Sequence, residues 1–312
     1  MATKKKKPAT KHYSHKKKKA TVHHAPKVSW LAGARLRTLP LAIAPVAAGA
    51  GIAANAKHFS LTLTLLCLAV AVFLQVGVNF ANDYSDGIRG TDAFRVGPAR
   101  LTGSGAKKPS TVRNVAFVFF GLALLAGLAI TILSAQWWFL AVGAVAVVAA
   151  WFYTGGKRPY GYSGLGELVV FIFFGVVATV GTAYVQQLSW SLKALFLSVG
   201  VGLLACAVLM INNIRDIETD VKASKKTLAV RLGKIPSLVV FCVMITVPMG
   251  IAGVVGIFYP HVLYTQFVWL AVIPAGVIAV FGKTPAEYIS VLKITSFASL
   301  AYGVLLGIGL AF

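Results

Sequence analysis

Most acidic residues of this chain lie in two short clusters of similar composition. Six of the eight Asp and Glu residues occur in NDYSDGIRGTD (82–92) and NNIRDIETD (212–220). Each cluster begins with Asn at the end of a long apolar run. Asn and Asp oxygens are hard ligands that suit Mg²⁺, which takes one or two carboxylates and completes its shell with waters and substrate phosphate oxygens. The clusters therefore indicate two half-sites that could hold a magnesium diphosphate between them.

The spacing within each cluster fits one face of a helix, because residues three or four apart share a stripe. By that spacing we expect a set of metal ligands whose aspartates are also catalytic. The set is Asn82, Asp83, Asp86, Asn212, Asp216 and Asp220. Glu218 is two residues from Asp216 and should point elsewhere. Solvated loop acids that balance nearby cations are the plainer alternative.

Basic residues are interleaved with the acids and could neutralise a departing diphosphate. The candidates are Arg89, Arg95, Lys157, Arg215 and Lys222. Arg100 and Lys225 follow the same two clusters. Each of these cations could equally serve only to orient the chain in a membrane. Arg215 is the hardest to explain in that way, since it lies inside the second cluster.

The segments that carry the clusters are hydrophobic. The 312 residues are 58% hydrophobic and only 12% charged, whereas soluble domains have about 25% charged residues. A membrane-spanning helix needs about 20 apolar residues to cross about 30 Å of hydrocarbon. Apolar runs of that kind cover 38–54, 61–81, 114–134, 136–153, 165–187, 194–213, 237–258, 262–281 and 286–311. The sequence predicts an all-α, polytopic membrane protein with nine transmembrane helices.

The distribution of cations predicts the topology. Cytoplasmic loops carry an excess of Lys and Arg. With nine spans and a cytoplasmic N-terminus, 27 of the 30 Lys and Arg residues fall on the cytoplasmic side. Only Lys57, Lys193 and Lys293 fall elsewhere. Both acidic clusters then face the cytoplasm, and the C-terminus lies outside.

The first 27 residues differ from the rest of the chain. They carry ten lysines and no apolar segment, so we expect a disordered cytoplasmic tail (1–27) ahead of one membrane domain (28–312). Its position before a membrane span favours contact with anionic lipid headgroups, and no nucleic-acid partner is expected. The histidines and cysteines have no spacing typical of a zinc site.

Three segments resemble the UbiA-type intramembrane prenyltransferases. They are NDYSDGIRGTD, RVGPARLTGSG (95–105) and NNIRDIETDVKASKKTLAVRLG (212–233). The resemblance runs from residue 30 to the last span and implies nine helices around a central cavity that is open to lipid. In many relatives the third Asp of the first motif lies four residues after the second, whereas Asp92 lies six after Asp86. Asp92 therefore stays outside the expected ligand set.

Within that superfamily, the loops are most similar to the branch that prenylates 1,4-dihydroxy-2-naphthoate in menaquinone biosynthesis. The resemblance implies Mg²⁺-dependent transfer of a polyprenyl chain from its diphosphate, with two ions and with loss of CO₂ and diphosphate, to give demethylmenaquinone. It also implies the plasma membrane of a bacterium. Arg35 and Arg37 are candidates for the acceptor's carboxylate, because guanidinium matches it with two parallel hydrogen bonds. Tyr153 completes the expected acceptor-binding set.

Two alternatives stay open on the sequence. A cation-coupled transporter could bind its ion with the same acids, although its ionisable groups should lie near the middle of the membrane. A prenyltransferase could also act on hydroxybenzoate, homogentisate, haem or a ribose phosphate. The acidic clusters do not separate these acceptors.

Overall fold

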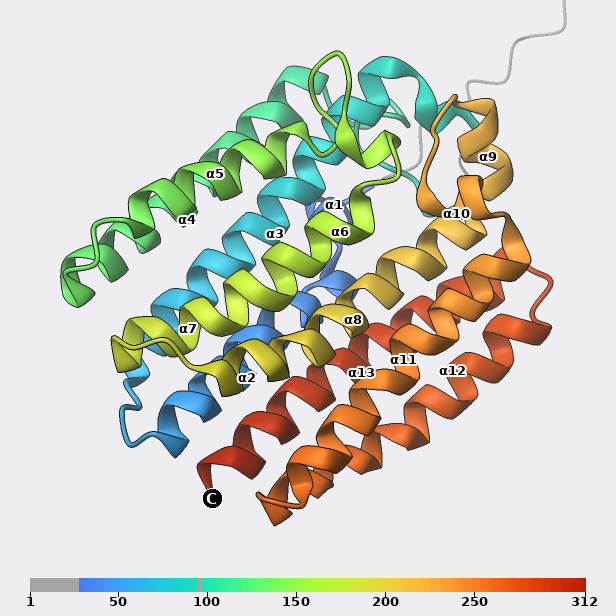
Figure 1. Ribbon diagram of the computed structural model, residues 1–312. Coiled ribbons are helices and arrows are strands. Elements are labelled where there is room, and N and C mark those ends of the chain that lie inside the picture. Colours follow the sequence, from blue (N-terminus) through green and yellow to red (C-terminus); the bar gives the residue numbers. More distant parts are fainter. Residues whose placement is uncertain (1–27, 95–96) are drawn as a thin grey trace, which may run out of the picture.

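A computed structural model describes residues 28–94 and 97–312, and this part of the chain is a bundle of helices without strands (Figure 1). The predicted tail and Arg95 lie outside the described residues. The helices are α1 (Trp30–Ala34), η1 (Leu36–Thr38), α2 (Pro40–Asn55), α3 (Leu61–Arg89), η2 (Thr91–Phe94), α4 (Pro109–Ser134), α5 (Phe139–Phe152), η3 (Tyr160–Tyr162), α6 (Gly166–Val170), η4 (Phe171–Val177), α7 (Ala178–Gln187), α8 (Leu192–Arg215), α9 (Ile217–Lys222), α10 (Leu228–Leu232), α11 (Lys234–Gly256), η5 (Pro260–Val268), α12 (Trp269–Phe281) and α13 (Pro285–Ala311).

All nine predicted apolar runs are helical in the structure, but the count of nine spans is not confirmed. Seven helical segments of the described chain are long and apolar enough to cross a membrane. The first predicted span is bent by 46° between Trp30–Thr38 and Pro40–Asn55, so it counts only if the bent pair crosses as one unit. Helix α5 has 14 residues, fewer than the roughly 20 that a straight span needs. The chain is a multi-pass membrane protein.

Short-range signals in the sequence explain where the helices begin. Ser60 and Ser191 precede α3 and α8, and each hydroxyl accepts a hydrogen bond from a backbone N–H in the first helical turn. Thr284 and Glu287 form a reciprocal capping box at the start of α13. These caps satisfy N–H groups that have no partner within the helix. Helix α3 ends at Arg89, and the next residue, Gly90, has a φ of 72°. Glycine adopts this left-handed conformation easily because it has no Cβ.

Glycines allow the central helices to approach closely. A Cβ added to Gly51 of α2 would lie 2.1 Å from the carbonyl oxygen of Gly307 in α13. One added to Gly303 would lie 2.3 Å from the carbonyl oxygen of Ala44. Gly303 and Gly307 are four residues apart, which is the spacing of small residues that packs membrane helices backbone to backbone. Helices α2 and α13 therefore form a tight pair in the middle of the bundle.

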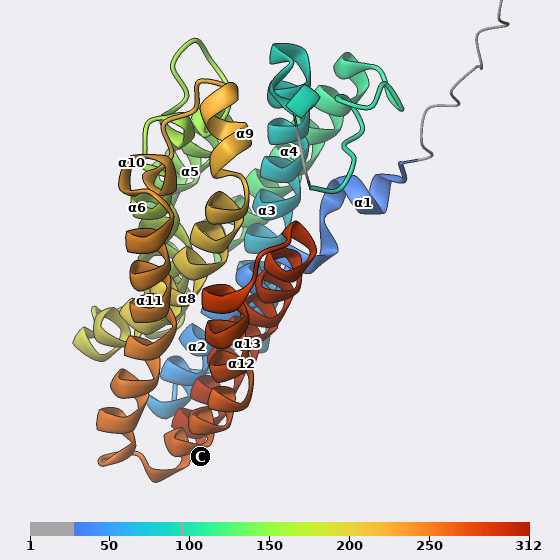
Figure 2. The same cartoon turned by 90° about the vertical axis from the view of Figure 1, so that its right-hand side faces the viewer.

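The segments that carry the two acidic clusters lie at one end of the bundle. Figure 2 shows α9, α10 and the C-terminal end of α3 at the end opposite the C-terminus of the chain. The span from Gly166 to Gln187 contains a π-helical segment, Phe171–Val177, and such segments frequently occur at functional sites. Phe173, Phe174 and Val177 of this segment line the cavity described next.

Candidate active site

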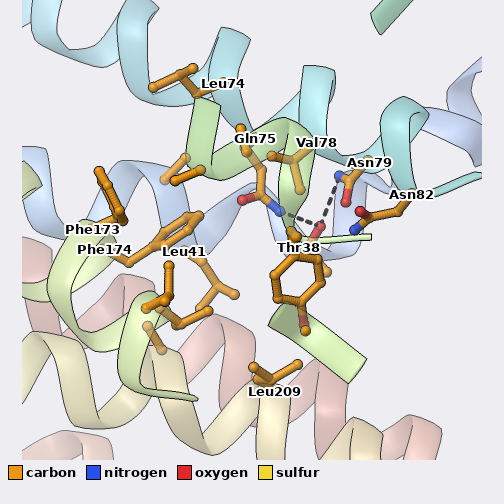
Figure 3. A pocket seen from close by; sticks show the side chains of 18 of the residues that line it. Thr38, Leu41, Leu74, Gln75, Val78, Asn79, Asn82, Phe173, Phe174 and Leu209 are labelled. Atoms are coloured by element: carbon orange, nitrogen blue, oxygen red, sulfur yellow. Dashed lines mark hydrogen bonds between the residues drawn. The ribbon is translucent and has the colours of Figure 1, made fainter. Parts of the chain in front are cut away.

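A cavity of about 380 Å³ lies between α2, α3, α5, α8 and the span from α6 to α7. Its wall is polar at one end and apolar at the other. Figure 3 shows Leu41, Leu74 and Phe173 on the apolar side and Asn82 at the polar end. Between them, the Thr38 hydroxyl accepts hydrogen bonds from Gln75 and Asn79 at 3.2 Å and 3.3 Å. This gradient suits an amphiphile with a charged head and a hydrocarbon tail.

The two acidic clusters meet at the polar end. Residues of both clusters line the cavity there, although 130 residues separate them in the chain. Asn82 and Asp86 come from α3, Asn212 from α8, Asp216 from the junction of α8 and α9, and Asp220 from α9. The structure brings together five of the six predicted metal ligands. The sixth, Asp83, is not among the lining residues.

Asp86 is the most heavily contacted acid of the site and is only 2% exposed. Arg100 donates a hydrogen bond to its Oδ2 at 2.5 Å, and Lys225 lies 3.4 Å from its Oδ1. The Tyr162 hydroxyl donates to the same Oδ1. Burial and the neighbouring Asp86 raise the pKa of Tyr162, so this phenol stays a donor. Three loops therefore converge on one carboxylate.

Asp83 is equally buried but does not line the cavity. Its Oδ2 accepts the backbone N–H of Leu101 at 2.9 Å, and its Oδ1 accepts that of Thr102 at 2.8 Å. Both bonds fix the loop that carries Arg100. Burial opposes the charge of Arg100, but Asp86, Asp92 and Asp83 outweigh it and raise the pKa of Arg100 above its usual value. The direct contacts of Asp83 thus anchor a loop, and its predicted metal role stays a prediction.

In the second cluster, the predicted stripe is interrupted. Helix α8 ends at Arg215, and Asp216 has a φ of −98° and a ψ of 7° before α9 begins. The expectation that Asn212, Asp216 and Asp220 share one continuous helix is therefore wrong, although all three reach the cavity. The break lets Arg215 turn back along the helix. Its guanidinium donates to both Asp216 oxygens, at 2.7 Å and 2.5 Å, and to Asn212 Oδ1 at 2.9 Å.

Asp220 differs from Asp216 because no cation in the described part of the chain forms an ion pair with it. Burial raises the pKa of Asp220 to about 6, and the neighbouring Asp216 and Asp86 act in the same direction, against Lys225 and Arg215. Its carboxylate is ionised at neutral pH. A bound cation would stabilise this charge more than that of Asp216, which Arg215 already contacts. Glu218 is exposed on the other face of α9, as its spacing predicts.

The predicted diphosphate-binding cations have different surroundings. Arg215 is bound to the second acidic cluster. The exposed Arg89 donates to the carbonyl oxygens of Thr154 and Gly156 and so fixes the segment after α5. Lys157 and Lys222 are exposed and are not among the cavity-lining residues. Their predicted roles stay predictions.

Two of the three predicted acceptor-binding residues reach the cavity. Arg35 and Tyr153 line the cavity. Arg37 is not among the lining residues, although it lies close enough to Arg215 and Asp216 for electrostatic interaction. Its carbonyl oxygen accepts a hydrogen bond of 2.7 Å from Ser296, which ties η1 to α13.

Several residues of the polar end are not among the site residues that the sequence predicts. Thr154 donates a hydrogen bond of 2.7 Å to Asn82 Oδ1, and Tyr162 donates to Asp86. Both lie in loops between spans, where no periodicity marks a functional side chain. Arg100 and Lys225 follow the clusters in sequence, but only the fold shows that both contact Asp86. Proximity to the acidic motifs was the one available signal.

The donor set fits a hard divalent cation. Among the described residues, no three His, Cys, Asp or Glu side chains are gathered closely enough to hold a metal ion by themselves. Mg²⁺ does not require such a group, because it keeps waters and shares its shell with phosphate oxygens. Asp86 and Asp220, with the amide oxygens of Asn82 and Asn212, present oxygen ligands to one end of the cavity. Arg100 and Lys225 beside them suit the phosphates.

Comparisons with known proteins agree with this geometry. A model of the UbiA prenyltransferase family matches residues 42–287. A Mycobacterium tuberculosis protein named 1,4-dihydroxy-2-naphthoate octaprenyltransferase is 45% identical over 91% of this chain and 97% of its own length. A protein of the same name from Haemophilus influenzae is 36% identical over 90% of this chain and 95% of its own.

A solved structure has a similar fold. A UbiA homologue from Archaeoglobus fulgidus, solved with DMAPP and Mg²⁺, superposes with a TM-score of 0.62 at 16% identity, over 89% of this chain and 99% of that one. At that identity the likeness concerns the fold, and the sequence matches carry the assignment. The chain therefore belongs to the UbiA prenyltransferase family.

Proposed function

We propose that this protein transfers a polyprenyl chain from polyprenyl diphosphate to 1,4-dihydroxy-2-naphthoate, with release of diphosphate and CO₂, to give demethylmenaquinol, the reduced form of demethylmenaquinone. The observation that carries the proposal is the meeting of both acidic clusters at the polar end of a cavity whose remainder is apolar. A diphosphate fits the first part and a prenyl chain the second. The names of the Mycobacterium and Haemophilus relatives support the naphthoate as acceptor.

In the proposed mechanism, Mg²⁺ would be held, as two ions, by Asn82, Asp86, Asn212, Asp216 and Asp220. Bound there, Mg²⁺ would supply positive charge against the diphosphate oxygens. Arg100 and Lys225 add fixed positive charge beside the leaving group as its C–O bond breaks. Asp83 keeps the Arg100 loop in place through its two backbone hydrogen bonds.

The apolar half of the cavity acts by excluding water. Leu41, Leu74, Phe173 and Phe174 surround the region next to the polar end. An allylic cation formed there would meet the electron-rich ring of the acceptor before it meets water. The CO₂ then leaves from the acceptor's carboxylate, which Arg35 is positioned to bind. No net proton transfer is required, because the carboxylate group leaves as the prenyl chain is added.

We further propose the membrane arrangement. Nine spans place the polar end of the bundle at the cytoplasmic face of a bacterial plasma membrane, with the C-terminus outside. The cation distribution supports this orientation. Single cysteines placed at Ser163 and at Lys57 in a cysteine-free background test it, because an impermeant maleimide added to intact cells should label only the second position.

Incubation of purified protein with radiolabelled polyprenyl diphosphate tests the activity. We expect a Mg²⁺-dependent prenylated product with dihydroxynaphthoate and none with hydroxybenzoate or homogentisate. Asp86→Asn and Asp216→Asn should each lower turnover at least about 100-fold, the usual loss when one group that stabilises transition-state charge is removed. Near-normal turnover in both variants would refute the metal site. A product formed only with another acceptor would leave the metal site intact and replace the substrate.

A further inference from the structure

Glu167 is a buried acid that the mechanism above does not use. It lies in the first turn of α6 and is 5% exposed. Its Oε1 accepts a hydrogen bond of 2.9 Å from Asn213 Nδ2. Its Oε2 is buried and has no hydrogen-bond partner in the described part of the chain. A carboxylate in a membrane-spanning helix is costly and typically functional, and an unsatisfied oxygen adds to that cost.

The residues around Glu167 face the cavity. Tyr153 and Asn213 both line it, from the end of α5 and from α8. The Tyr153 hydroxyl lies beside the start of α6, 3.5 Å from where a Cβ of Gly166 would stand. The Tyr153 hydroxyl is close enough to both Glu167 and Arg35 for electrostatic interaction.

This patch adjoins both halves of the acidic site along the chain. Asn213 follows Asn212, which belongs to the second cluster. Tyr153 precedes Thr154, which bonds to Asn82 of the first cluster at 2.7 Å. A molecule bound at Tyr153 would therefore lie beside the reacting end of a prenyl diphosphate. The patch offers a cation, a phenol and an amide, and the acceptor of the proposed function carries a carboxylate and two hydroxyl groups.

We propose that Arg35, Tyr153 and Asn213 form the acceptor subsite, and that Glu167 is the residue that positions it. This inference rests on the proposed function. Arg35 binds the acceptor's carboxylate. When the acceptor binds, the Tyr153 hydroxyl donates to the second oxygen of Glu167 and accepts a hydrogen bond from an acceptor hydroxyl. Electron density on that hydroxyl, and hence on the ring carbon that attacks, increases.

The subsite makes a specific prediction about hydroxyl recognition. In Glu167→Gln the bond to Asn213 survives through the amide oxygen, but the negative charge behind Tyr153 is lost. The wild-type protein should bind 1,4-dihydroxy-2-naphthoate more tightly than 2-naphthoate, which lacks both hydroxyls. In the variant, the ratio of these two affinities should fall by about tenfold to 100-fold, the range expected for a hydrogen bond to a charged group. Tyr153→Phe should lose it to a similar extent, and Glu287→Gln, at a distant helix cap, should keep it.

Equilibrium binding of both naphthoates, measured anaerobically without Mg²⁺ or prenyl diphosphate, tests the subsite separately from catalysis. In the full reaction, Glu167→Gln should raise the KM for the acceptor and leave the KM for polyprenyl diphosphate unchanged. Glu167→Asp should restore part of the preference. A wild-type ratio of the two affinities in Glu167→Gln and Tyr153→Phe would overturn the inference. If the wild-type protein prenylates another hydroxylated acid, the proposed acceptor fails, and the same ratio measured with that acid and its deoxy analogue decides the role of Glu167.

Discussion

The Arg100 guanidinium lies 2.5 Å from Oδ2 of Asp86, so a loop cation neutralises a carboxylate that we propose as a metal ligand. Both side chains are buried, at 9% and 3% exposure. The attraction between these two charges is strong because little water screens it. Removing one partner would leave the other charge buried and unpaired, which is unfavourable. A metal ion at Asp86 must therefore compete with Arg100, and the diphosphate offers Arg100 new partners.

Arg100→Met tests this competition. Without the guanidinium, Asp86 keeps Tyr162 and Lys225 and has a more available Oδ2. We expect the affinity for Mg²⁺ alone to rise by at least about tenfold, because repulsion between two cations about 4 Å apart is worth about 1 kcal/mol in bulk water and about 4 kcal/mol near a protein surface. The KM for polyprenyl diphosphate should rise by a similar factor. Calorimetric Mg²⁺ titration and initial rates measure the two effects, with Lys108→Met, an exposed cation of the same loop, as control. Weaker Mg²⁺ binding in Arg100→Met would contradict the idea.

Asp83→Asn distinguishes a loop anchor from a metal ligand. Asparagine has one acceptor oxygen where Asp83 uses two, so the N–H of Leu101 or of Thr102 loses its partner. The lost hydrogen bond should destabilise the loop by about 1.5–3 kcal/mol, which is typical for hydrogen bonds to a charged group. We expect faster hydrogen exchange at residues 97–108 and a lower turnover, with Mg²⁺ affinity in the absence of substrate unchanged. A large fall in that affinity would instead make Asp83 a direct ligand.

The contrast between Asp83 and Asp86 explains what the sequence could and could not predict. Local spacing identified the helical stripe of Asn82 and Asp86, because α3 continues without a break to Arg89. It could not separate Asp83 from that stripe, since the partners of Asp83 lie eighteen and nineteen residues away. The break at Asp216 was equally hidden, because the spacing of four residues between Asn212, Asp216 and Asp220 continues across it.

The fold was easier to predict than the site. Apolar runs of span length and the capping residues at their starts are local properties of the chain, and all nine runs form helices. The bend between Trp30–Thr38 and Pro40–Asn55 and the shortness of α5 affect the span count but not the apolar pattern. Tyr162 of the short helix η3 contacts Asp86, and Thr154 in the segment after α5 contacts Asn82. Such contacts depend on tertiary structure alone.

The raised pKa of Asp220 predicts how Mg²⁺ binding depends on pH. Burial raises this pKa to about 6 in the metal-free protein, so the carboxyl group is mostly neutral only below that pH. The metal binds the carboxylate and must displace any proton. At pH 7.5 the group is already ionised, whereas below about 6 the Mg²⁺ affinity should fall by about tenfold per pH unit for one displaced proton.

Titrations in two buffers of different ionisation enthalpy measure that proton release. We expect close to one proton per Mg²⁺ at about pH 5 and little release near neutral pH. Asp220→Asn should bind Mg²⁺ more weakly, with most of this pH dependence removed. Equal affinities at about pH 5 and pH 7.5 in the wild-type protein would show that Asp220 does not bind the metal.

The tight contact of α2 with α13 predicts a steep cost for one methyl group. In Gly51→Ala the new Cβ would lie 2.1 Å from the carbonyl oxygen of Gly307, a backbone atom that cannot move without separating the two helices. We expect the free energy of unfolding to fall by at least about 2 kcal/mol, as for overpacking in a dense core. Gly121→Ala in α4 is the matched control, because nothing lies within 4 Å of its Cβ, and it should be neutral or slightly stabilising. Thermal unfolding of both variants in the same detergent measures the difference, and equal midpoints would mean that α2 and α13 are not packed through these glycines.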